Sequence, residues 1–206
     1  MKHIGVDEAG KGDYFGYLVI AGVVLDDTNE KKLKLLGVKD SKLLSDIAVK
    51  KIASEIKKAC EYDIVKISPE RYNQLYTKFK SLNKLLAWGH ARVIKNLIEK
   101  TSCDRAISDK FGDESLIKDQ LKGVKIDLVQ KINAESDTAV AAASILARDE
   151  FLTTLRKLGR EVGIVLPKGS THVKETAKAL LNKYDENILS IVAKTHFKIT
   201  KQVLKK

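Results

Sequence analysis

The chain has 206 residues, of which 44% are hydrophobic and 32% are charged. This length and balance are typical of a globular protein with one substantial core, so we predict a single domain over residues 1–206. Its 38 Lys and Arg residues outnumber its 27 Asp and Glu residues and give a formal net charge of +11. This excess favours a polyanionic partner, with nucleic acid first and an anionic membrane surface second.

Targeting and membrane segments are not evident in the sequence. The longest apolar run, Tyr17 to Leu25, is too short for a bilayer span, which needs about 20 residues. The N-terminus shows no signal-peptide pattern, so we expect a cytoplasmic protein that does not enter a membrane. Cys60 and Cys103 are far apart and match no metal-ligand spacing, so we expect two reduced thiols.

The first half of the chain predicts three strands with helices after the second and third. Residues 2–8 and 17–25 have strand character, and the second of these runs is apolar enough for a buried central strand. Ser45 is a plausible N-cap for the helix that follows it. Residues 62–68 predict a third strand, and Pro69 predicts the start of a short helix.

The second half predicts two more strands among longer helices. Apolar residues at helical spacing predict one amphipathic helix over residues 81–100, whose Trp88 and His90 we assign to packing. Short strands are predicted at 105–109 and 123–129, followed by an Ala-rich helix over 138–158. Two or three helices are expected from Gly169 onwards. Together these elements predict an α/β fold with a mixed sheet and helices on its faces.

The stretch Gly5-Val6-Asp7-Glu8-Ala9-Gly10-Lys11-Gly12 combines two acids with a glycine loop in a basic protein. A dinucleotide-binding loop must open into a helix, but this loop opens into a strand, and no phosphate-binding loop ending in Gly-Lys-Ser/Thr is present. A tight hairpin with solvated acids at the strand end is the alternative. Acids inside a strand are costly unless they are paired or bound to metal.

Two later acids favour a metal site. Asp109 ends a predicted strand, and Glu135 lies just before the Ala-rich helix. Carboxylates from three separate elements that meet at one sheet edge would bind a hard divalent cation. Two Mg²⁺ or Mn²⁺ ions, about 3.5–4 Å apart, would then activate water and stabilise the leaving oxygen in phosphodiester hydrolysis.

Six ordered blocks resemble the type 2 ribonuclease H family, and most closely its ribonuclease HIII branch. They are GVDEAGKGDYFG, DSKLLSD, SLNKLLAWGHA, NAESDTAVAAASILAR, LPKGS and THFK, and they run from residue 4 to about residue 198. The resemblance implies a ribonuclease H-like fold with a five-stranded mixed sheet and a helical C-terminal region from about residue 169. It also implies cleavage of the RNA strand of RNA/DNA hybrids, with 5′-phosphate and 3′-hydroxyl ends.

The resemblance places the family's four acidic residues on Asp7, Glu8, Asp109 and Glu135, as catalytic residues and metal ligands. Neighbouring residues of a strand point to opposite faces. We therefore predict that Asp7 bridges both ions and that Glu8 coordinates less directly. Asp109 would complete one ion's shell, and Glu135 would hold the other ion or its water.

The same resemblance implies residues that contact the substrate. The loop of Gly10, Lys11 and Gly12 matches the family's glycine loop, where the backbone tests for 2′-hydroxyls. The plausible phosphate contacts are Ser41, Lys42 and Lys168. Members of the HIII branch usually carry an additional N-terminal substrate-binding domain, and we expect none in this chain, which starts at the first catalytic strand. We expect a monomer with no obligate protein partner.

Other functions stay open at the level of the sequence. The nearest alternative is incision at a single ribonucleotide in duplex DNA, as in ribonuclease HII, although the family's junction tyrosine has no clear counterpart here. A nucleic-acid-binding module without catalysis would be favoured by a missing acid, yet all four acids are present. A membrane-surface protein is disfavoured because the basic residues are scattered.

Overall fold

The computed structural model describes residues 2–38 and 41–205, and within them one five-stranded sheet forms in the order β3-β2-β1-β4-β5. β1 pairs antiparallel with β2, and β2 with β3, whereas β4 runs parallel to both β1 and β5. The mixed sheet predicted from the sequence is therefore confirmed. Its strands are β1 (His3–Ala9), β2 (Leu18–Leu25), β3 (Tyr62–Ile67), β4 (Arg105–Asp109) and β5 (Asp127–Lys131).

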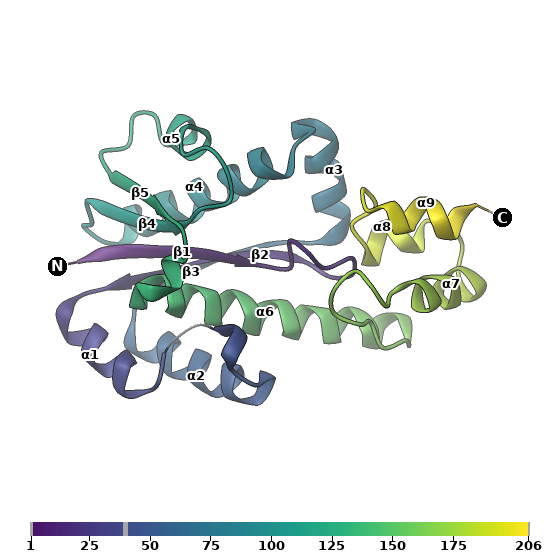
Figure 1. The fold of residues 1–206 in the computed structure, drawn as a ribbon, viewed down its shortest axis with the longest axis horizontal. Coiled ribbons are helices and arrows are strands. Elements are labelled where there is room, and N and C mark those ends of the chain that lie inside the picture. The colour runs from purple at the N-terminus through teal and green to yellow at the C-terminus, as the bar shows by residue number, and fades with distance from the viewer. Residues whose placement is uncertain (1, 39–40, 206) are drawn as a thin grey trace.

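Helices cover both faces of the sheet (Figure 1). One face carries α1 (Asp27–Leu35), α2 (Asp46–Ala59) and α6 (Thr138–Val162). The other carries α3 (Pro69–Phe79), α4 (Leu82–Lys100) and α5 (Ser115–Gln120). The remaining helices α7 (Lys174–Lys183), α8 (Ile188–Val192) and α9 (Lys198–Leu204) gather at one end. Two short 3₁₀ helices are also present, η1 (Ser41–Leu43) and η2 (Ala134–Ser136).

The sheet separates two hydrophobic cores because its side chains alternate between the faces. In β1, Ile4 and Val6 pack into the core under α4. Gly5 faces α6, and a Cβ at this position would stand 2.2 Å from the backbone carbon of Ala139. Alanines along α6 and glycine on β1 thus let this helix lie unusually close to the sheet, which explains the Ala-rich composition noted in the sequence.

Local signals in the sequence placed most element ends correctly. Ser45 caps α2 by accepting a hydrogen bond from the Ala48 N–H, and Pro69 opens α3. The predicted strand 123–129 was wrong at its start, because Gly123 has a positive φ of 82° in a turn and β5 begins only at Asp127. The helices α1 and α5 were not predicted.

The C-terminal region contains three helices in the described residues, as expected from Gly169 onwards. Cys60 and Cys103 are free thiols, in agreement with the sequence. Within residues 2–38 and 41–205, no helix has both the length and the apolar character needed to cross a bilayer.

Candidate active site

Four carboxylates from three elements line one cavity of about 500 Å³. Asp7 and Glu8 lie near the end of β1, Asp109 is the last residue of β4, and Glu135 lies in η2. Parallel strands present their carboxyl ends at the same sheet edge. Val6 pairs with Ser108 in the parallel register, so Asp7 and Asp109 are the next neighbours along the two strands. The structure therefore brings all four predicted acids together.

Asp7 and Glu8 point to opposite faces of the sheet. Asp7 lies on the α6 side, where its carboxylate receives a hydrogen bond from the Ser144 hydroxyl. Glu8 lies on the α4 side, with its Oε2 atom 2.9 Å from His90 Nε2. Its Oε1 atom is 2.6 Å from Lys11 Nζ. The alternation of side chains along β1 thus gives the two acids different environments at one cavity.

These environments shift the two carboxyl pKa values in opposite directions. Burial, followed by the charge of Glu8, raises the pKa of Asp7 from 3.8 to about 7. Burial also opposes ionisation of Glu8, but hydrogen bonds and positive charge from His90 and Lys11 outweigh it and lower its pKa to about 2. At neutral pH Glu8 is therefore ionised. Ionisation of Asp7 is unfavourable in the fold, and a nearby cation would make it more favourable.

His90 connects Glu8 to β4. Its ring is fully buried, and Nδ1 lies 3.0 Å from the Ser108 hydroxyl. The Ser108 hydroxyl in turn donates to the Asp109 carbonyl at 3.0 Å. The packing role predicted for His90 is confirmed by its burial, but the sequence missed this hydrogen-bonded line. The available signal was a polar ring on an apolar helix face, because such a ring needs buried partners.

The acids offer a suitable donor set for a hard divalent cation. Within the described residues, no three His, Cys, Asp or Glu side chains are already arranged as a metal-binding cluster. The four acids nevertheless share one cavity and present only oxygen donors, which Mg²⁺ and Mn²⁺ prefer. Asp7 is buried beside the charges of Glu8 and Asp109, an arrangement that a bound cation would stabilise. The residues therefore fit such an ion, although Glu8 already pairs with His90 and Lys11.

Most of the predicted substrate residues lie at the same cavity. Its lining includes Gly10, Lys11, Ser41 and Lys168. Gly12 is exposed on the same loop but is not part of this lining. The side chain of Lys42 lies outside the described part of the structure.

Two of these residues already have protein partners. The Ser41 hydroxyl lies 2.9 Å from the Ser144 hydroxyl, and Lys168 Nζ donates to Asp46 at 3.0 Å. Sequence reasoning missed Arg148, which also lines the cavity. Its guanidinium donates to the Ser41 carbonyl and to Asp46 Oδ1, so it ties η1 and α2 to α6.

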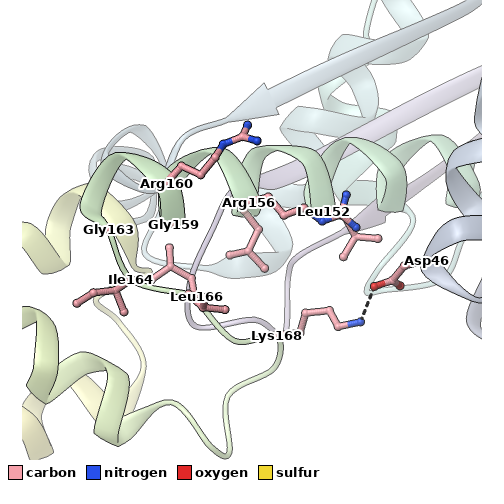
Figure 2. A pocket seen from close by; sticks show the side chains of 11 residues that line it. Asp46, Leu152, Arg156, Gly159, Arg160, Gly163, Ile164, Leu166 and Lys168 are labelled. Atoms are coloured by element: carbon pink, nitrogen blue, oxygen red, sulfur yellow. Dashed lines mark hydrogen bonds and ion pairs between the residues drawn. The ribbon is translucent and has the colours of Figure 1, made fainter.

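A second cavity, of about 580 Å³, adjoins the first and shares Leu152 and Lys168 with it. It lies along the C-terminal half of α6 and the loop that follows (Figure 2). Figure 2 shows Ile164 and Leu166 along that loop, Arg156 and Arg160 on the helix, and Lys168 reaching Asp46. Basic side chains thus line both of these adjoining cavities.

Comparison with known proteins gives consistent results for sequence and fold. A model of the ribonuclease HII family matches residues 4–200. A protein of Protochlamydia amoebophila (strain UWE25) named ribonuclease HIII is 50% identical over 207 residues, which is 99% of this chain and 69% of that protein.

Solved structures agree with these sequence relatives. Bst-RNase HIII in complex with Mn²⁺ matches with a TM-score of 0.93 at 34% identity, over 99% of this chain and 69% of that one. RNase HII from Archaeoglobus fulgidus, solved as a complex with PCNA, matches with a TM-score of 0.82 at 31% identity, over 99% of this chain and 97% of that one. The resemblance carried by the six sequence blocks is confirmed.

Proposed function

The chain belongs to the ribonuclease HII family, and from this premise we propose that it is a metal-dependent endonuclease that cuts the RNA strand of RNA/DNA hybrids. The observation that carries the proposal is the convergence of Asp7, Glu8, Asp109 and Glu135 on one cavity. Lys11, Arg148 and Lys168 line the same cavity, so an acidic centre lies beside basic side chains. This charge pattern suits a phosphodiester, because cations bound by the acids and the basic side chains would both attract its negative charge.

The four acids would hold Mg²⁺ or Mn²⁺ in a two-ion site. When bound, the ions supply an activated water and neutralise charge on the leaving oxygen, which gives 5′-phosphate and 3′-hydroxyl ends. Asp7 would have the central role, because it is buried beside the charges of both Glu8 and Asp109, where a cation is most favourable. His90 fixes the Glu8 carboxylate, and the Ala134 N–H fixes Asp109 by donating to its Oδ1 at 3.2 Å.

Recognition of the hybrid is assigned to the loop after β1 and to the basic side chains. The exposed backbone around Gly10, Lys11 and Gly12 tests for 2′-hydroxyl groups, which separate RNA from DNA. Ser41, Lys42 and Lys168 contact phosphates. Lys168 can exchange Asp46 for a phosphate at low cost, because its side chain is 54% exposed and exposed ion pairs contribute little.

The test offers the protein three duplexes with Mg²⁺ or Mn²⁺. These are a full RNA/DNA hybrid, duplex DNA with a single ribonucleotide, and plain duplex DNA. We expect cleavage of the hybrid within its RNA strand, products with 5′-phosphate ends, and no cleavage of plain DNA. Binding of the hybrid without any cleavage would refute the enzyme and leave a nucleic-acid-binding module.

The second duplex separates the two branches of the family. Efficient cutting at the lone ribonucleotide would assign the HII type of activity, which the match of the HII family model makes worth testing. Addition of EDTA serves as the control, because removal of divalent ions must stop cleavage of every substrate.

A further inference from the structure

Lys194, in the segment between α8 and α9, has no exposed surface. Burial of an ammonium group is costly unless its N–H groups find partners. A lysine buried this deeply is therefore expected to have hydrogen-bond partners for its nitrogen.

The Lys194 ammonium binds the backbone of the loop between β1 and β2. Nζ donates to the Asp13 carbonyl at 2.9 Å and to the Gly16 carbonyl at 2.7 Å. It also lies 5.7 Å from the centre of the Tyr72 ring, which is close enough for a cation–π contact. Burial lowers its pKa to about 7, against the opposing charge of Asp13. Either protonation state retains the two N–H groups that the two carbonyls require.

The backbone on both sides reinforces this attachment. The Lys194 N–H donates to the Tyr14 carbonyl at 2.8 Å, and the Gly16 N–H donates to the Val192 carbonyl at 2.9 Å. Phe15 forms an isolated antiparallel bridge with Ala193. The stretch from Asp13 to Gly16 is therefore bound along its length to the segment that carries Lys194.

The same loop reaches the candidate active site at two points. Gly10, Lys11 and Asp13 line the acidic cavity. The Asp13 carboxylate accepts a hydrogen bond of 2.6 Å from the Gly169 N–H, and Gly169 directly follows Lys168. The position of the Asp13 backbone thus affects both the glycine loop and the loop that carries a proposed phosphate contact.

We propose that Lys194 is a positioning residue for substrate binding, which holds the loop of residues 10–16, and through Asp13 the Lys168 loop, in the shape that receives the hybrid. This inference rests on the proposed function of the cavity. Lys194 touches no substrate and none of the four acids. Its loss should therefore weaken hybrid binding and leave metal binding unchanged.

The test compares Lys194→Met with wild type and with Lys194→Arg. For Lys194→Met we expect the KM for an RNA/DNA hybrid to rise about tenfold or more, with kcat changed by less than about threefold. Mn²⁺ affinity, measured by calorimetry without substrate, should be unchanged. Hydrogen exchange should rise at the amides of Tyr14 and Gly16, and Lys194→Arg should restore part of the protection.

Lys183→Met is the control, because Lys183 also donates to a backbone carbonyl but lies at an exposed position. Lys183 Nζ donates to the Val162 carbonyl at 3.0 Å and lies 5.2 Å from the Tyr184 ring centre, but it does not contact this loop. This variant should leave the KM unchanged. If Lys194→Met does not fold, Asn73→Ala replaces it. Asn73 holds the same segment through hydrogen bonds to the Ala193 carbonyl and the Thr195 N–H, so its loss should raise the KM in the same direction.

An unchanged KM and unchanged loop exchange in Lys194→Met, or in Asn73→Ala if that variant is needed, would overturn the inference. A loss of Mn²⁺ affinity as large as the rise in KM would also overturn it, because Lys194 would then act on the positions of the four acids. If wild type cuts no hybrid, the proposed function fails separately, and hydrogen exchange still tests whether Lys194 orders the loop.

Discussion

Asp7 and Glu8 are neighbours in the chain, yet the fold raises the pKa of one and lowers that of the other. The difference arises from their partners. Glu8 has the imidazole of His90 and the ammonium of Lys11, whereas Asp7 has a serine hydroxyl and two nearby acids. Groups held in an unfavourable charge state are common at functional sites, where a bound ligand removes the cost.

We predict that Asp7→Asn stabilises the metal-free protein and abolishes cleavage. The pKa of Asp7 is 3.8 in the unfolded chain and about 7 in the fold, so the folded state keeps a proton that the unfolded state releases. The free energy of unfolding of wild type therefore falls as pH rises through this window. Above it, the variant should be more stable by about 1–4 kcal/mol.

Urea unfolding in EDTA at several pH values measures this difference. The gap between variant and wild type should be small near pH 4 and constant above pH 7. Mn²⁺ should raise the melting temperature of wild type more than that of Asp7→Asn. A variant that retains cleavage would disprove the proposed role of Asp7 in metal binding.

Among the secondary-structure elements, α6 positions several residues of the site. Asp137 caps α6 by accepting from the Ala139 N–H, directly after η2 with Glu135. Further along α6, Ser144 and Arg148 reach the same cavity. The close contact between α6 and Gly5 of β1 therefore sets the distance between the acid of η2 and those of the strand.

Gly10 and Gly12 give a second prediction, because the fold requires a glycine at position 10 but not at position 12. Gly10 has a φ of +88°, and a Cβ there would stand 2.2 Å from the Tyr17 carbonyl oxygen. Gly12 has no such φ, and a Cβ there would meet nothing within 4 Å. We expect Gly10→Ala to cost about 1–3 kcal/mol of stability and Gly12→Ala to cost less than about 0.5 kcal/mol.

Gly12→Ala should nevertheless weaken cleavage of the hybrid, because its added methyl group enters the space where the loop backbone is proposed to approach the 2′-hydroxyl groups. Thermal unfolding and steady-state kinetics of the two variants separate these effects. Normal hybrid kinetics in a well-folded Gly12→Ala protein would show that this glycine does not approach the substrate.

For the whole molecule, a net charge of +11 is combined with an acidic centre that has basic side chains beside it. Lys11, Arg148 and Lys168 line the acidic cavity, and Arg156 and Arg160 line the cavity beside it. Such an arrangement attracts a polyanion to the molecule while the acids stay available for cations. Affinity should then depend more on ionic strength than on base sequence.

We predict steep salt dependence for hybrid binding. If about five phosphates are neutralised, affinity should fall on the order of 10²–10³-fold between 50 and 200 mM salt. Fluorescence anisotropy with the Asp7→Asn variant in EDTA measures this without cleavage. A slope near zero would contradict a binding surface built from these basic residues.

The order of strands and helices could be predicted from the sequence, and so could the four acids that line the cavity. Short-range signals were reliable where the cause is local, as at the Ser45 cap and the Pro69 helix start. They were weaker where a turn competes with a strand, as at Gly123, whose positive φ delays β5 to Asp127. The helices α1 and α5, which were not predicted, lie on opposite faces of the sheet.

The sequence determined which residue types lie on which element, because periodicity and capping depend on neighbours in the chain. Tertiary structure alone decided which of them meet. It set His90 against Glu8, 82 positions apart, and placed the Lys194 ammonium on carbonyls 178 and 181 positions away. Burial and partners at such separations depend on packing of the whole sheet, so the charge states of Asp7 and Glu8 could be known only from the folded molecule.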